Sequence, residues 1–62
     1  MRYSELKRYL TRNECYKTDE GSRHELWYSP LSNKTFPVSR HNNEDVPNGT
    51  LNSILKQAGL KK

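Results

Sequence analysis

The sequence has few of the residues that build disulfides, phosphate loops and metal sites. Its single cysteine, Cys15, has no partner within the chain, which predicts a reduced protein without disulfides. The three glycines are isolated at positions 21, 49 and 59, so there is no glycine-rich phosphate-binding loop. One cysteine and two separated histidines match no zinc-ligand spacing. We therefore expect neither a metal nor a cofactor.

Long apolar runs are also absent. The N-terminal stretch MRYSELKRYL contains no segment long enough for a signal peptide or a membrane span, which predicts a cytoplasmic protein with no membrane partner. A chain of 62 residues accommodates one domain, predicted to cover residues 1–62. Only 31% of the residues are hydrophobic, so we expect a thin core that gains stability from a bound partner.

Positive charge is in excess. The formal net charge is +4, and basic residues occur in every segment of the chain rather than in one tail. A small basic domain is typical of proteins that bind a polyanion, most often a nucleic acid. A soluble surface without a ligand explains the same composition, and the charge alone leaves both interpretations open.

Two segments have helical periodicity. In the first, Ser4 is a candidate cap for a helix that ends near Asn13 and places Leu6, Tyr9 and Leu10 on one face with Asn13. The second begins near Thr50, and Gly59 is expected to end it in the left-handed conformation, with Leu60 folding back on Leu55. Its predicted buried stripe follows the i, i+3, i+4, i+7 spacing: Leu51, Ile54, Leu55 and Ala58.

Three short segments between the helices are predicted to be strands, at residues 15–19, 24–29 and 35–39. Tyr16 and Thr18 would share one face of the first strand. Pro37 cannot donate a hydrogen bond to a neighbouring strand, so the third strand is expected to lie at an edge of the sheet or to have its amide side free at this position. The predicted fold is α+β, of order α-β-β-β-α, with two helices on one face of a three-stranded antiparallel sheet.

The stretch GSRHELW is the strongest candidate for chemistry. His24 follows a Gly21-Ser22 turn, whose backbone amides could face an anion, and is flanked by Arg23. Trp27 lies three residues further on, and a cation, an imidazole and an aromatic ring together could bind single-stranded RNA. An imidazole can also move a proton to or from an RNA oxygen. Strand alternation does not settle which face His24 occupies, because Leu26 and Trp27 would lie on opposite faces and both favour burial.

Two other residues carry competing interpretations. His41 follows Arg40 after the third strand, and is either an RNA contact or second proton donor, or a polar loop residue. Cys15 is either half of a cysteine–histidine dyad or, as is more common at a strand start, a small buried side chain.

Taken together, GSRHELW, TFPVSRH and NGTLNSILKQAGL resemble the motifs of the HicA, or YcfA-like, family of toxin mRNA interferases. The resemblance extends from Ser4 to Leu60. It implies a fold like that of double-stranded-RNA-binding domains, ribosome-independent cleavage of mRNA, His24 as the catalytic residue and a HicB-type antitoxin as partner. The RNA-binding candidates are Gly21, Ser22, Arg23, Trp27, Arg40 and His41.

The chain departs from the family pattern at Arg23, where a small residue or a histidine is frequent, and in the loop HNNEDVPNG, which is not lysine-rich. Glu44 and Asp45 in this loop weaken the attraction for phosphate at the helix start near Thr50. The chain also lacks the lysine cluster with which double-stranded-RNA-binding domains hold duplex phosphates, so binding to double-stranded RNA is not expected. Two alternatives remain open at this point. One is an RNA-binding module of the same fold without catalysis, and the other is a protein-interaction domain.

Overall fold

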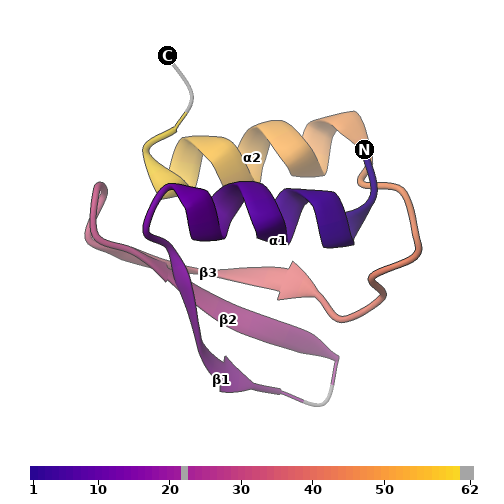
Figure 1. Cartoon of the computed structure of the whole chain (residues 1–62), viewed down its shortest axis with the longest axis horizontal. Helices are drawn as coiled ribbons and strands as arrows, with labels where there is room; N and C mark the ends of the chain where they lie inside the picture. The colour runs from indigo at the N-terminus through magenta and orange to yellow at the C-terminus, as the bar shows by residue number, and fades with distance from the viewer. Residues whose placement is uncertain (22, 61–62) are drawn as a thin grey trace.

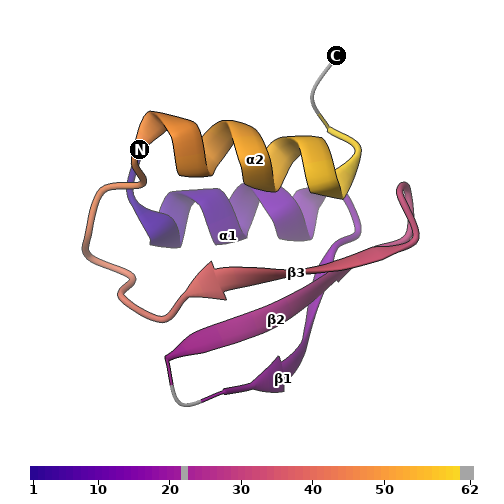
Figure 2. The ribbon, with the colours of Figure 1, turned by 180° about the vertical axis from the view of Figure 1, so that it is seen from behind.

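The computed structural model describes residues 1–21 and 23–60. The elements follow the predicted order: α1 (Tyr3–Arg12), β1 (Tyr16–Glu20), β2 (His24–Ser29), β3 (Lys34–Ser39) and α2 (Asn48–Ala58). The three strands form one antiparallel sheet of order β1-β2-β3. Figure 1 shows both helices side by side over one face of the sheet, and the reverse view in Figure 2 shows the same two layers. The α+β fold is therefore confirmed.

Burial alternates strictly along β2, and this alternation resolves the ambiguity between Leu26 and Trp27. Glu25, Trp27 and Ser29 are buried toward the helices, whereas Leu26 is 37% exposed. The larger ring of Trp27 has more apolar surface to bury, so its face becomes the core face. His24 alternates with this set and belongs with Leu26 to the face that the helices leave open.

The core lies between the helices and the inner face of the sheet. Phe36 and Val38 of β3 are almost completely buried, as are Leu6 and Leu10 of α1. The cluster comprises Tyr3, Leu6, Leu10, Cys15, Trp27, Phe36, Val38, Val46, Ile54 and Ala58. Because β3 pairs only with β2, Pro37 lies on an edge strand as its missing amide donor requires.

The start of α1 differs from the sequence prediction. Ser4 does not cap the helix, which begins at Tyr3 with Arg2 in the cap position. The carboxylate of Glu5 accepts the Arg2 backbone N–H at 2.9 Å. Two further amides of the first turn are satisfied from the β3–α2 loop, since Tyr3 N–H donates to the Glu44 carbonyl and Ser4 N–H to the Asn42 carbonyl. Backbone carbonyls far along the chain thus replace the expected side-chain cap.

Two predicted faces were also wrong in part. Tyr9 is 41% exposed, and Tyr3 occupies the buried face of α1 beside Leu6 and Leu10. Strand β1 is displaced by one residue from its prediction, and its register against β2 shifts between Lys17 and Asp19. The irregularity falls at Thr18, so the simple alternation of Tyr16 with Thr18 does not persist through this strand.

The end of α2 follows the prediction. Gly59 has φ 76°, and the amides of Gly59 and Leu60 donate to the carbonyls of Lys56 and Leu55, which is the Schellman pattern. The β2–β3 hairpin is tied to this helix end, because the Ser29 hydroxyl donates to the Ala58 carbonyl at 2.6 Å. This fixes α2 against the sheet.

The beginning and the buried stripe of α2 need correction. The helix starts at Asn48, two residues before the predicted Thr50, and Pro47 occupies the cap position. Ile54 and Ala58 are buried, but Leu51 and Leu55 are only half-buried against the core. Ile54 is therefore the main apolar anchor of this helix. In the described part of the chain, no helix is long and apolar enough to cross a membrane.

Candidate functional site

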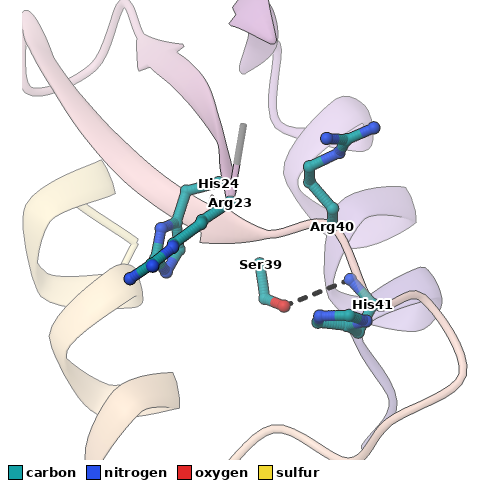
Figure 3. Close-up of a pocket in the computed structure, with 5 residues that line it drawn as sticks. All are labelled: Arg23, His24, Ser39, Arg40 and His41. Atoms are coloured by element: carbon teal, nitrogen blue, oxygen red, sulfur yellow. Dashed lines mark hydrogen bonds between the residues drawn. The ribbon is translucent and has the colours of Figure 1, made fainter. Parts of the chain in front are cut away.

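An open hollow of about 630 Å³ lies at the end of the sheet where β2 begins and β3 ends. Among the described residues, two at the start of β2 and three at the end of β3 line it: Arg23 and His24, and Ser39, Arg40 and His41. Figure 3 shows Arg23 and His24 together on one side, His41 on the other, and Ser39 between them. The structure thus brings together both histidines of the sequence, which are 17 positions apart in the chain.

The strand register positions these side chains. His24 is the register partner of Ser39, so the two residues lie directly opposite each other in neighbouring strands. The Ser39 hydroxyl oxygen accepts the backbone N–H of His41 at 3.1 Å. This bond fixes the direction in which the chain leaves β3. It therefore sets the position of His41 relative to His24.

A second bond holds the loop after β3 to the β1–β2 turn. The Arg40 guanidinium donates to the Gly21 carbonyl at 3.3 Å, and in Figure 3 its side chain points away from Ser39. The turn itself closes when Gly21 N–H donates to the His24 carbonyl at 2.9 Å. A Cβ at position 21 would lie 2.8 Å from that carbonyl oxygen, so the close approach requires glycine.

The roles predicted for the turn change accordingly. The amide of Gly21 is engaged within the turn, so it does not face an anion as the sequence suggested. Gly21 shapes the site without offering this donor to a ligand. Ser22, the other predicted turn contact, lies outside the described residues.

Trp27 is the clearest correction among the predicted RNA contacts. Its side chain is only 6% exposed, and its indole N–H donates to the Glu25 carboxylate at 3.0 Å. It faces the helices, so it cannot stack on a base at the surface. Cys15 is also buried, at 2% exposure, whereas both histidines are exposed. This confirms Cys15 as a small buried side chain and argues against a cysteine–histidine dyad.

The hollow is positively charged. Its lining contains two arginines and two imidazoles and, among the described residues, no carboxylate. Arg40 also interacts with Glu20 nearby. An ion pair with Lys17 is the main reason that the pKa of Glu20 is lowered, and the charge of Arg40 adds to this effect. Arginine guanidinium groups are planar and bind phosphate oxygens with bidentate hydrogen bonds, so the lining suits a phosphodiester.

On the opposite face of β2, a closed set of polar side chains lies beneath the helices. The Lys7 ammonium of α1 is 3.1 Å from the Glu25 carboxylate and also donates to the Asn42 side chain. Burial tends to raise the pKa of Glu25, but hydrogen bonds from Trp27 and Lys7 outweigh it and lower the pKa of this carboxyl. Glu25 is therefore ionised at neutral pH and fully engaged with the fold.

Neither Ser39 nor the Lys7–Glu25 pair was predicted from the sequence. The position of Ser39 could have been predicted from the hairpin. When residues 24–29 pair antiparallel with residues 34–39, position 39 lies opposite His24. The Lys7–Glu25 pair carried no such signal, because its members lie in different elements and meet only when α1 packs on the sheet.

Comparison with protein families decides the relationship. A model of the HicA toxin of bacterial toxin-antitoxin systems matches residues 3–60. The chain belongs to the HicA toxin family. Comparison with curated proteins and with solved structures found no match.

Membership of the HicA family makes this a chain of the toxin class and implies an antitoxin as its partner. The match covers every helix and strand, including both sides of the hollow. Within residues 1–21 and 23–60, no group of three or more His, Cys, Asp or Glu side chains is arranged to hold a metal ion. Among the described residues that line the hollow, the side-chain groups are imidazole, guanidinium and hydroxyl.

Proposed function

We propose that this HicA-family chain is an endoribonuclease that cleaves mRNA, with His24 as its catalytic residue. The observation that carries the proposal is the position of His24 in an open hollow lined by Arg23 and Arg40. The Arg23 guanidinium beside His24 can bind the phosphate, the charge of Arg40 adds to the attraction, and the exposed imidazole can exchange a proton with an oxygen next to it.

RNA supplies its own nucleophile for this reaction. When a base removes the proton of the 2′-hydroxyl, the 2′-oxygen attacks the adjacent phosphorus and the bond to the 5′-oxygen breaks. The products are a 2′,3′-cyclic phosphate and a 5′-hydroxyl. This route uses proton transfer and phosphate binding, both of which the side chains of the hollow can provide, so we propose that cleavage does not depend on a metal.

Single-stranded RNA is the substrate class that fits the hollow. The hollow is open and lies at the end of a small sheet, and the adjoining loop carries the acidic residues Glu44 and Asp45. These carboxylates oppose the close approach of a second phosphate strand. With Trp27 buried, recognition of bases falls to exposed side chains of the open face and the loops.

We further propose that a HicB-type antitoxin inhibits the chain by covering the hollow. Arginine-containing, exposed sites are frequent anchors of protein interfaces, and the net charge of +4 favours an acidic partner. Trp27 is buried, so the surface that we propose the antitoxin covers consists of Arg23, His24 and the loop after β3. Amide exchange of residues 21–30 should slow on co-expression with the antitoxin. Equal exchange in free and neutralised toxin would refute occlusion.

The test of the enzymatic function is the substitution His24→Ala. The exposed side chain at a strand end contributes little to the core, so the variant should fold but lose RNA cleavage and growth arrest. Wild-type protein should release fragments with a cyclic phosphate end. A variant that binds RNA normally and cleaves at the wild-type rate would show that His24 is only a contact. A wild type without any cleavage would favour a non-catalytic RNA-binding or protein-interaction module.

A further inference from the structure

We propose that His41 is the second proton-transfer group of the site and acts with His24 on the two reacting oxygens of one phosphodiester. This inference rests on the proposed RNA-cleaving function. It adds a catalytic residue to a site for which sequence alone left His41 either a contact or a polar loop residue.

The stereochemistry of the reaction calls for two groups. In an in-line displacement, the attacking 2′-oxygen and the leaving 5′-oxygen lie on opposite sides of the phosphorus. The 2′-oxygen loses its proton to a base as the new oxygen–phosphorus bond forms. The 5′-oxygen takes a proton from an acid as the old bond breaks. One imidazole cannot lie within hydrogen-bond distance of both oxygens in the same orientation, so the other oxygen exchanges its proton with water or, at a greater rate, with a second side chain across the phosphate.

The hollow offers such a second group. His24 and Ser39 are register partners, and facing residues in antiparallel strands have Cα atoms about 4.5–5.5 Å apart. His41 follows two residues later, so its Cα lies at most about 7 Å from that of Ser39. Figure 3 shows the two imidazoles on either side of Ser39 rather than stacked on each other. The space between them is the hollow, where a phosphate can be bound.

The backbone of His41 is fixed rather than left to a free loop. Its N–H donates to the Ser39 hydroxyl oxygen at 3.1 Å, and its carbonyl accepts the Glu44 N–H at 3.1 Å. The next residue, Asn42, accepts hydrogen bonds from Ser4 and Lys7 of α1. A catalytic group must be held within a narrow range of positions, and these bonds provide that constraint.

Several titratable and charged groups surround His41. They are His24 and Arg23 at the start of β2, Arg40 beside it, Glu44 and Asp45 in its loop, and Lys7 on α1. In the proposed reaction one histidine acts as the base and the other as the acid, so the two work in opposite protonation states. A pH–rate profile of the wild type should therefore be bell-shaped, and each histidine variant should lose one of its two limbs.

The decisive experiment compares two RNA substrates that differ in one atom. One is a single-stranded oligoribonucleotide with the normal 5′-oxygen at the cleaved link, and the other has sulfur at that position. A thiolate leaves without being protonated, so the sulfur substrate bypasses the need for the acid but not for the base. His24→Ala, His41→Ala and His41→Gln are compared with the wild type, with Asn43→Ala as an exposed control in the same loop. Thermal unfolding verifies that each variant is folded.

We expect His41→Ala and His41→Gln to lower kcat on the oxygen substrate by about 10²–10⁴-fold, with Asn43→Ala unchanged. We also expect the sulfur substrate to restore the activity of the variants at one histidine only, which identifies that histidine as the acid and the other as the base. His41 variants that stay within about threefold of wild-type kcat, or whose loss lies only in KM, would overturn the inference. Rescue of both positions, or of neither, would also overturn it. A wild type inactive on both substrates would instead contradict the proposed function.

Discussion

His24 and Glu25 are neighbours in the sequence, yet they belong to two polar regions with opposite properties. Glu25 joins a closed cluster formed by Lys7, Glu25 and Trp27 between α1 and the sheet, and the exposed Asn42 bonds to Lys7 at its edge. His24 joins the open hollow formed by Arg23, His24, Ser39, Arg40 and His41. In the closed cluster, Lys7 and Glu25 satisfy each other and their side chains are only 12% and 11% exposed. In the open hollow, two imidazoles and two guanidinium groups lie at the surface, and no carboxylate of the described residues lines it.

The comparison shows how a single strand can serve two purposes. Alternation along β2 sends successive side chains to opposite faces, so one residue can secure α1 while the next meets a ligand. Charged residues in the closed cluster have already been paired by the fold, and removing one leaves its partner buried and unpaired. The side chains that line the open hollow lie at the surface, where a ligand can reach them. We therefore expect substitutions in the closed cluster to change stability and those in the open hollow to change activity.

The largest effect on stability should come from Lys7→Met. This change leaves the buried Glu25 carboxylate without its ammonium partner, and breaking a buried pair in this way costs about 3–5 kcal/mol. Lys17→Met is the matched control, because it breaks the pair with Glu20, whose side chains are 40% and 59% exposed. That surface pair should contribute at most about 1 kcal/mol. Urea unfolding of both variants measures the difference, and equal losses would remove the distinction between closed and open charges.

The next effect separates two adjacent apolar residues of α2. Ile54→Ala should lower the free energy of unfolding by about 2–5 kcal/mol, because Ile54 is 3% exposed and its loss leaves a cavity. Leu55→Ala should cost less, since Leu55 is half-buried at the edge of the core. The comparison of their melting temperatures tests the helix register. A greater loss for Leu55→Ala would show that the register of α2 is wrong.

The fold could be predicted from local signals wherever one residue type has a specific backbone role. Gly59 ended α2 as predicted, and Pro37 marked an edge strand. Predictions failed where contacts distant in sequence decide the outcome. The amides at the start of α1 are satisfied by carbonyls of the β3–α2 loop, so Ser4 was not needed as a cap. Burial of Trp27 depended on which face of β2 the helices would cover, and the alternation pattern permitted both.

The candidate site was predictable in its residues but not in its geometry. Four of the five residues that line the hollow were singled out from the sequence, and Ser39 was missed. Its hydroxyl has no distinctive sequence pattern, and its importance arises from the register with His24 and the bond to the His41 amide. The position of the two histidines on either side of one hollow likewise could be seen only once the β2–β3 hairpin was formed.

A smaller effect should appear as the pH is lowered. Because the pKa of Glu25 in the folded protein lies below its ordinary value of 4.5, the unfolded chain binds this proton more readily. The stabilisation is complete above about pH 4.5 and is lost as the pH falls through the lower folded value. Glu5 and Glu20 also have lowered pKa values, so melting curves between about pH 3 and 6 should be compared with those of Glu25→Gln. An identical slope for both proteins would contradict this role of Glu25.

The smallest effect is expected from removal of divalent ions. Arg23 and Arg40 provide the positive charge of the open hollow. In the proposed mechanism the attacking group belongs to the RNA. Cleavage should therefore proceed at the same rate in EDTA as in its absence. Loss of activity in the chelator, with recovery on addition of a divalent ion, would show that the hollow requires a metal in addition to its own cations.

The separation of stability from activity along β2 is tested best by measuring RNA cleavage and unfolding free energy for two neighbouring substitutions, His24→Ala and Glu25→Gln. We expect His24→Ala to lower kcat by about 10²–10⁴-fold with little change in stability, since it removes an exposed group of the open hollow. Glu25→Gln should lower stability while the fraction that remains folded keeps its cleavage rate. Wild-type cleavage by His24→Ala, or loss of cleavage by Glu25→Gln in protein shown to be folded, would show that the two faces of β2 are not divided in this way.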